Sequence, residues 1–188
     1  MAILSGAGIS TDSGIPGYRG PKGPWRKAPE AEKLVQYDAY MADPDIRRRS
    51  WQLRRTSATW NAEPNAAHRA VAALERSGVA VRVITQNVDG LHQAAGLSPR
   101  ERLDPVVLSQ AMAVAKGCEV FVAVGTTLQV QPAASLAGIA AEHGARLIVM
   151  NAEPTPYDAP AQETIREPIG TAPPALLERL ADEAGPGA

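Results

Sequence analysis

Four short apolar segments, each followed by small or polar residues, constrain the fold of this chain more than any other feature. The segments are 2–4, 79–84, 120–124 and 147–150, and they are followed by Ser5-Gly6, Thr85-Gln86-Asn87, Gly125-Thr126-Thr127 and Asn151-Ala152-Glu153. Uninterrupted apolar runs of this length are typical of strands that are buried on both faces of a parallel sheet. The pattern therefore predicts a parallel sheet that contains these four segments.

Between the segments lie stretches with helical periodicity, each of which opens at or near a proline and closes near a glycine. These stretches are 64–77, 105–116 and 132–143, and they are followed by Gly78, Gly117 and Gly144. In a chain of 188 residues, this alternation predicts one domain, 1–188, with a doubly wound, Rossmann-like α/β fold. Ligands of such sheets bind at the carboxyl ends of the strands, so we expect the polar strand ends to share one crevice.

Two regions interrupt this alternation. Residues 14–29 are rich in glycine and proline, which predicts a loop without regular structure. Residues 30–60 have the pattern of a charged helical insert packed beside the sheet, with Trp51 and Trp60 as its expected anchors. We expect the tail after Ala181 to fray.

The composition narrows the classes of partner. The formal net charge is −1, and basic residues alternate with acidic ones except at 47–49 and 54–55, which disfavours nucleic-acid binding. No apolar run reaches the roughly 18 residues that a membrane span needs, so we expect a cytoplasmic protein without a membrane partner. The one cysteine, Cys118, can form neither a disulfide nor a cysteine zinc site within one chain, and we interpret it as a small buried hydrophobe. The oligomeric state stays open.

A glycine-rich turn, Gly6-Ala7-Gly8-Ile9-Ser10, directly follows the first apolar segment. Glycines at this place let the backbone approach a pyrophosphate, while the next helix presents its N-terminal amides. A hydride-transferring dehydrogenase is disfavoured, because Thr11 replaces the third glycine of its fingerprint and Gly14-Ile15-Pro16 cuts the helix short. A glycine turn without a ligand is the structural alternative.

The other strand ends add amide, carboxylate and hydroxyl groups to the same crevice. Gln86, Asn87 and Asp89 suit the ribose and carboxamide of a cofactor, although Asn87 or Asp89 alone also fits a helix N-cap. The two threonines after segment 120–124 suit phosphate or ribose, and Glu153 suits the hydroxyls of adenosine. Their placement at successive strand ends predicts a dinucleotide site.

Six motifs, in this order and spacing, closely resemble those of the sirtuin family of bacterial NAD-dependent protein lysine deacylases. The motifs are Gly6-Ala7-Gly8-Ile9-Ser10; Ser13-Gly14-Ile15-Pro16 with Tyr18-Arg19; Pro64-Asn65 with His68; Gln86-Asn87-Val88-Asp89-Gly90-Leu91-His92; Gly125-Thr126-Thr127-Leu128-Gln129-Val130 with Pro132-Ala133-Ala134; and Asn151-Ala152-Glu153. The resemblance covers nearly the whole chain.

The resemblance implies an enzyme that consumes NAD, transfers the acyl group of a modified lysine in a protein or peptide to ADP-ribose, and releases nicotinamide. It implies that loop 14–29 folds over the nicotinamide end, and that Asn87 and Asp89 hold the nicotinamide pocket and act in catalysis. The cofactor-binding residues that it implies are Gly6, Ala7, Gly8, Ser10, Thr11, Ile15, Pro16, Tyr18, Arg19, Trp25, Gln86, Asn87, Val88, Asp89, Gly125, Thr126, Thr127, Val130, Asn151, Ala152, Glu153 and Ala172.

The chain departs from the family at Arg100 and Glu101, where an internal segment looks deleted. In the family, that segment carries the catalytic histidine, two cysteine pairs that bind zinc, and a stretch that grips the acyl-lysine. Here no histidine lies between His92 and His143, and the cysteine ligands of zinc are absent. Gly17 also stands where many relatives have aspartate.

No convincing replacement for the missing histidine is present. His92 is the remaining candidate base, but packing or helix capping is favoured for it, and a structural role is favoured for His68. Trp51 and Arg54 fall where relatives that prefer acidic acyl groups carry tyrosine and arginine. A succinyl or malonyl preference therefore stands beside the alternative of a salt-bridged surface arginine.

We therefore expect a sirtuin-type deacylase core whose deacylation is impaired. One alternative is a module that binds NAD or ADP-ribose without turnover. The other is an NAD glycohydrolase or ADP-ribosyltransferase, in which water or another nucleophile captures the ribose.

Overall fold

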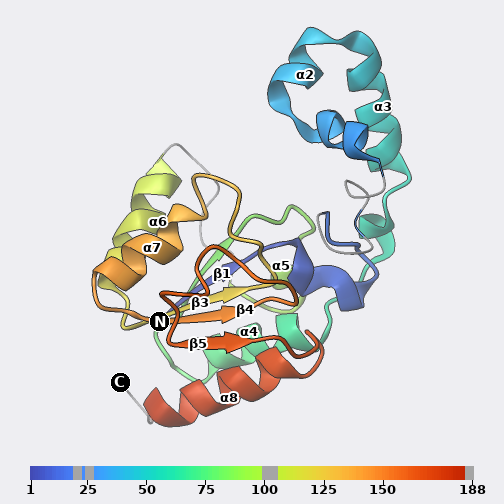
Figure 1. The fold of residues 1–188 in the computed structure, drawn as a ribbon. Coiled ribbons are helices and arrows are strands. Elements are labelled where there is room, and N and C mark those ends of the chain that lie inside the picture. Colours follow the sequence, from blue (N-terminus) through green and yellow to red (C-terminus); the bar gives the residue numbers. More distant parts are fainter. Residues whose placement is uncertain (19–22, 24–27, 99–105, 185–188) are drawn as a thin grey trace.

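A parallel sheet forms the centre of the computed structural model, which describes residues 1–18, 23, 28–98 and 106–184. Five strands of this described part pair in the order β2-β1-β3-β4-β5, and every pairing is parallel (Figure 1). The strands are β1 (Ala2–Ser5), β2 (Arg82–Thr85), β3 (Val120–Val124), β4 (Arg146–Met150) and β5 (Glu163–Ile165). The four predicted strands and the doubly wound class are confirmed.

Helices cover both faces of the sheet. Figure 1 shows α6 (Val106–Gly117) and α7 (Ser135–Glu142) on one face, and α4 (Ala66–Arg76) and α8 (Ala172–Ala184) on the other. Successive side chains of a strand point to opposite faces. Phe121 accordingly packs in the core under α6 and α7, whereas Val122 packs in the core under α4 and α8. Each apolar run thus contributes side chains to both hydrophobic cores, one on each face of the sheet.

Two elements near the C-terminus were not predicted from the sequence. Strand β5 has only three residues, none of them buried, so it lacks the apolar signal that marks the other strands. Helix α8 did carry a signal, since Leu176, Leu177 and Leu180 are spaced for one helix face and are buried against α4. The helix continues to Ala184, so the expectation of fraying after Ala181 is wrong for residues 182–184.

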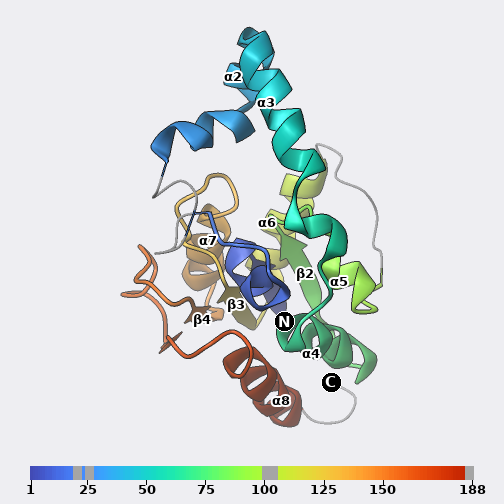
Figure 2. The same cartoon turned by 90° about the vertical axis from the view of Figure 1, so that its right-hand side faces the viewer.

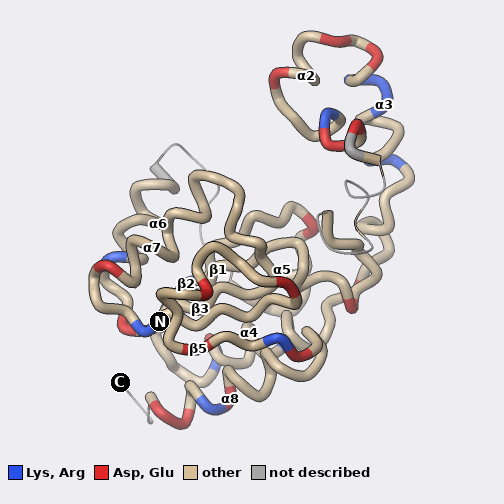
Figure 3. Tube along the Cα trace, viewed as in Figure 1, with Lys and Arg blue, Asp and Glu red and all other residues tan. Residues whose placement is uncertain are grey.

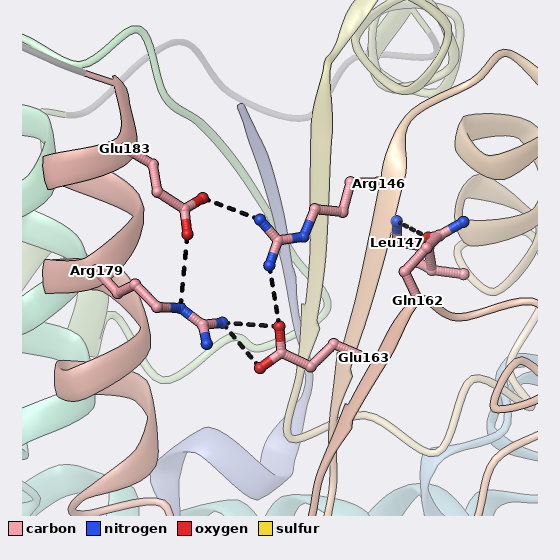
Figure 4. A network of polar contacts seen from close by, with 6 residues as sticks. All are labelled: Arg146, Leu147, Gln162, Glu163, Arg179 and Glu183. Carbon is pink, nitrogen blue, oxygen red and sulfur yellow. Dashed lines mark hydrogen bonds and ion pairs between the residues drawn. The ribbon is translucent and has the colours of Figure 1, made fainter.

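A network of ion pairs fastens α8 to the β4–β5 edge of the sheet (Figure 4). Glu163 of β5 accepts hydrogen bonds from Arg179 of α8 at 2.7 and 2.8 Å, and one from Arg146 of β4 at 3.2 Å. Arg146 also pairs with Glu183 at 2.9 Å. Hydrogen bonds from Arg179, and the charges of both arginines, hold the pKa of Glu163 below its usual range.

Glu163→Gln should lower the free energy of unfolding by about 1 kcal/mol, because the pairs are partly exposed and screened by solvent. The lowered pKa means that this stabilisation is present above pH 4.5 and is lost as the pH falls through the folded-state value. Urea unfolding at pH 7 and pH 3 measures both effects. Asp45→Asn is the control, since its pair with Arg48 is mostly exposed and should contribute nothing measurable. Equal losses in the two variants would contradict the prediction.

Residues 29–61 form a helical unit that extends away from the sheet. It contains the 3₁₀ helices η2 (Pro29–Val35) and η3 (Ala58–Asn61), with α2 (Tyr37–Ala42) and α3 (Pro44–Arg55) between them. Figures 1 and 2 both show α2 and α3 far from the strands. In Figure 3, Lys, Arg, Asp and Glu are interspersed along the chain, and the arginine run 47–49 lies on α3.

The expectation that Trp51 and Trp60 anchor this unit beside the sheet is wrong. Their exposed fractions are 54% and 74%, and their indole N–H groups donate to the Tyr40 hydroxyl and to the Arg54 carbonyl within the unit. The Arg54 guanidinium lies 5.2 Å from the centre of the Trp51 ring, as in cation–π pairs. The tryptophans therefore stabilise local contacts, because the unit lies too far from the core to bury them there. No helix in the described part of the chain has the length and apolarity to cross a bilayer.

Candidate functional site

A cavity of about 910 Å³ lies at the carboxyl ends of the strands, where the sequence predicts the ligand crevice. It is lined by the segments after β1, β2, β3 and β4, by loop 14–18 with Gly23, and by residues 166–169. Fifteen of the 22 predicted cofactor-binding residues line it: Gly6, Ala7, Gly8, Thr11, Pro16, Tyr18, Gln86, Asn87, Gly125, Thr126, Thr127, Val130, Asn151, Ala152 and Glu153. The four polar strand ends thus share one cavity.

The glycine-rich turn after β1 packs directly against the turn after β3. A Cβ atom on Gly6 or Gly8 would lie 2.8 or 2.7 Å from atoms of Gly125, which is closer than contacts of real Cβ atoms. The amides of Gly6 and Gly8 donate to the carbonyls of Val124 and Gly125, so they are already used inside the protein. The glycines therefore let the turn after β1 pack closely against the turn after β3. The sequence also predicts that they let a ligand approach the backbone closely. The 3₁₀ helix η1 (Ala7–Ser13) follows and ends at Gly14, which has a left-handed φ of 83°.

Hydrogen bonds link neighbouring strand ends around the cavity. Gln86 donates its side-chain N–H to the Thr126 hydroxyl at 3.2 Å, and the same hydroxyl oxygen accepts the Leu128 amide at 3.3 Å. On the β4 side, Asn151 donates to the Glu153 carbonyl at 2.8 Å, and Arg166 donates to the Asn151 carbonyl at 2.7 Å. Residues 166–169 were missed because they follow β5, which has no apolar sequence signal.

Seven predicted cofactor-binding residues are not among the lining residues. Arg19 and Trp25 lie outside the described residues, as do 20–22, 24, 26 and 27. Five other residues that the resemblance implies as cofactor-binding do not line this cavity: Ser10, Ile15, Val88, Asp89 and Ala172. Ser10 is fully buried and donates to Asp89 at 2.7 Å, Val88 is 94% exposed, and Ala172 begins α8.

None of the three histidines lines the cavity. His68 is fully buried in the first turn of α4, in a capping box with Asn65, and His92 is 2% exposed in α5 (Leu91–Ala94). Burial lowers the pKa of His68 to about 4, helped by the adjacent His92 ring and opposed by Asp89. Burial also lowers the pKa of His92. His143 is exposed at the end of α7, and its Nδ1 lies 2.8 Å from the Ile139 carbonyl oxygen.

The residues do not fit the zinc ion that the resemblance implies. Cys118 is the one cysteine of the chain; it is half-buried and its Sγ donates to the Ala115 carbonyl. Within residues 1–18, 23, 28–98 and 106–184, no three His, Cys, Asp or Glu side chains form a cluster that could hold a metal. Trp51 and Arg54, the candidates for acyl selection, lie on α3 and do not line the cavity.

Comparison with known proteins identifies the relatives of this chain. The profile of the Sir2 family matches residues 6–104, which is more than half of the chain. NAD-dependent protein deacetylase 2 of Streptomyces coelicolor is 56% identical, with 96% of this chain and 97% of that protein covered. A solved Sir2 homologue in complex with NAD has a TM-score of 0.80 at 32% identity, covering 97% of this chain and 89% of that chain. A Sir2 protein with a deacetylated p53 peptide and 3'-O-acetyl ADP-ribose has a TM-score of 0.84 at 25% identity, covering 96% and 93%.

The match to the Streptomyces protein also shows that part of the relative has no counterpart here. It extends over 234 positions, 46 more than the 188 residues of this chain (234 − 188), so at least 46 positions face gaps. This agrees with an internal deletion, whose predicted junction at 100/101 lies within residues 99–105, outside the described part. The sequence motifs, the fold and the relatives agree: the chain belongs to the Sir2 family.

Proposed function

We propose that the cavity binds NAD as the cosubstrate of Sir2-type protein lysine deacetylation, and that deacetylation by this chain is impaired. The observation that carries the proposal is that the four polar strand ends line one cavity, while no imidazole reaches it. Its volume of about 910 Å³ falls within the 300–1,000 Å³ typical of ligand pockets. The residues that line it fit the parts of a dinucleotide.

The residues at the two ends of the cavity would bind different parts of NAD. Glu153 and Asn151, on the β4 side, would hold the adenosine hydroxyls, and Thr126 and Thr127 would contact phosphate or ribose oxygens. Asn87, on the β2 side, would hold the nicotinamide end. When bound, NAD supplies an electrophilic ribose carbon with nicotinamide as the leaving group. Pro16 and Tyr18 line the cavity from loop 14–29 and would exclude water from that carbon.

Impairment follows from the positions of the histidines. Deprotonation of a ribose hydroxyl needs a base with a pKa near neutrality, within hydrogen-bond reach of that hydroxyl. His68 and His92 are buried and do not line the cavity, and His143 caps the C-terminal end of α7. An acetyl-lysine peptide, the precursor of the deacetylated peptide held in the related complex, would therefore bind at a site that lacks this base.

The test follows NAD, nicotinamide and peptide in one reaction. The purified chain is incubated with NAD and an acetyl-lysine peptide, and binding of NAD is measured by calorimetry. We expect NAD to bind, with little deacetylated peptide formed. Glu153→Gln should weaken NAD binding about tenfold or more through loss of charge-assisted hydrogen bonds. Glu142→Gln, at an exposed position of α7, is the matched control.

Each outcome separates the candidates. Accumulation of deacetylated peptide would contradict the proposed impairment. Loss of that product in His92→Ala, with NAD binding unchanged, would assign the base to His92. NAD binding without any product would favour the second candidate, a module that binds NAD or ADP-ribose. Nicotinamide release without deacetylated peptide would instead indicate a glycohydrolase or ADP-ribosyltransferase.

A further inference from the structure

Two chains of hydrogen bonds run from buried histidines to Asn87, a residue that lines the cavity. In the first, His92 Nε2 lies 2.9 Å from Ser5 Oγ, and the Ser5 hydroxyl donates to Thr85 Oγ1 at 2.9 Å. Thr85 Oγ1 also accepts the backbone N–H of Asn87 at 3.1 Å. This series of hydrogen bonds therefore holds the backbone N–H of Asn87 in place.

The second chain holds the side chain of Asn87. His68 Nε2 lies 3.4 Å from Ser10 Oγ, and the Ser10 hydroxyl donates to Asp89 Oδ2 at 2.7 Å. The Asn87 amide donates to Ser10 Oγ at 3.3 Å and to the Gly6 carbonyl at 3.1 Å. The two chains thus meet at one residue, from two sides.

The hydrogen bonds dictate where the histidine protons lie. A serine hydroxyl has one hydrogen, and Ser5 and Ser10 give theirs to Thr85 and Asp89. The Asp89 carboxylate can only accept, so the Ser10 oxygen must accept from His68, which carries its hydrogen on Nε2. With Ser5 donating to Thr85, the Ser5 oxygen likewise accepts from Nε2–H of His92. His68 Nδ1 is then free to accept the Asn65 backbone N–H, at 3.3 Å. Asn65 Oδ1, 3.0 Å from the same nitrogen, would accept its hydrogen in the other tautomer.

The network is deeply buried and its two rings are in contact. Ser5, Ser10 and His68 have no exposed surface, and the histidine rings meet edge to face with centroids 5.1 Å apart. His92 Nδ1 has no hydrogen-bond partner, although it is buried. Apolar side chains would fill such a place without these polar costs, so stability alone does not explain the network. Orientation of the residue where both chains end does explain it.

We propose that His68 and His92 are positioning residues, which fix Asn87 at the β2 side of the cavity through Ser10 and Ser5. Neither histidine lines the cavity, so each acts through a serine. The proposal rests on NAD binding in the cavity. It predicts that loss of either histidine weakens recognition at the β2 side, while the β4 side, with Asn151 and Glu153, keeps its geometry.

Binding of two ligands distinguishes positioning from a general structural role. NAD reaches both sides of the cavity, whereas ADP-ribose lacks nicotinamide, so calorimetry is done with each. His92→Leu and His68→Leu should weaken NAD binding about tenfold and ADP-ribose binding less than about twofold. Glutamine keeps an N–H donor at similar reach, so His92→Gln should restore most of the NAD affinity. His143→Leu, on exposed surface, should change neither constant.

A double-mutant cycle tests whether the effect passes through Asn87. In an Asn87→Ala background, His92→Leu should cause no further loss of NAD affinity. Equal losses for NAD and ADP-ribose, or an undiminished loss in the Asn87→Ala background, would overturn the proposal.

A measurement on the unmodified chain needs neither a variant nor a ligand. Nitrogen-15 NMR at pH 7 reports the tautomer of each histidine, and we expect Nε2–H for His68 and His92. Nδ1–H on His68 would overturn the proposal. If the unmodified chain failed to bind NAD, the proposed function would be wrong, and the tautomers together with slow exchange of the Asn87 amide would still decide the positioning role.

Discussion

Gly125→Ala should strongly destabilise the folded state and abolish the binding of NAD. Gly125 has a left-handed φ of 61°, and a Cβ atom there would lie 2.2 Å from the Ile9 amide nitrogen. The neighbouring atoms belong to the backbone of the glycine-rich turn and cannot move aside as a flexible side chain would. Left-handed strain and displacement of the turn together should cost about 4 kcal/mol or more, a large share of the stability of a domain.

Gly144→Ala is the matched control for this substitution. Gly144 also has a left-handed φ, of 88°, but a Cβ atom there would meet nothing within 4 Å. We expect it to cost only the conformational strain, about 1–2 kcal/mol, and to leave NAD affinity unchanged. Urea unfolding and calorimetry with NAD measure both variants. Similar losses in the two variants would show that strain, and not contact between the two loops, determines the effect.

Acidification should destabilise the protein through its buried histidines. The folded state holds the pKa of His68 at about 4, against 6.5 for an unburied histidine, and it also lowers the pKa of His92. Between these pKa values, the unfolded chain therefore binds protons at the two histidines that the folded chain does not bind. The stability due to the neutral His68 is complete above pH 6.5, and it decreases by about 3 kcal/mol as the pH falls to about 4.

His68→Gln isolates this contribution from that of the carboxylates. The variant will be less stable at pH 7, but its free energy of unfolding should decrease less between pH 6.5 and 4 than that of the unmodified chain. The groups that face His68 are His92, Asp89 and Arg69, and all three are unchanged in the variant. Parallel curves for the His68 variant and the unmodified chain would contradict the prediction.

The sequence alone determined the fold class and the place of the site. Apolar runs identify β1, β3 and β4 because the two faces of each strand lie in two separate cores. Polar residues directly after these runs predict a shared crevice, since the carboxyl ends of parallel strands lie at one edge. Strand β5 was missed because its three residues are not buried, and the Arg166 side of the cavity was missed with it.

Only the tertiary structure decided which polar residues face the cavity. Ser10, Asn87 and Asp89 are all polar residues near strand ends, yet Asn87 lines the cavity while Ser10 and Asp89 bond to each other behind it. Trp51 and Trp60 are apolar, yet they are exposed because their helices extend away from the sheet. Local patterns specify strands and turns, because these depend on neighbours in the chain. The partners of His68 and His92 are up to 87 residues away, so the packing of the whole sheet is what brings them together.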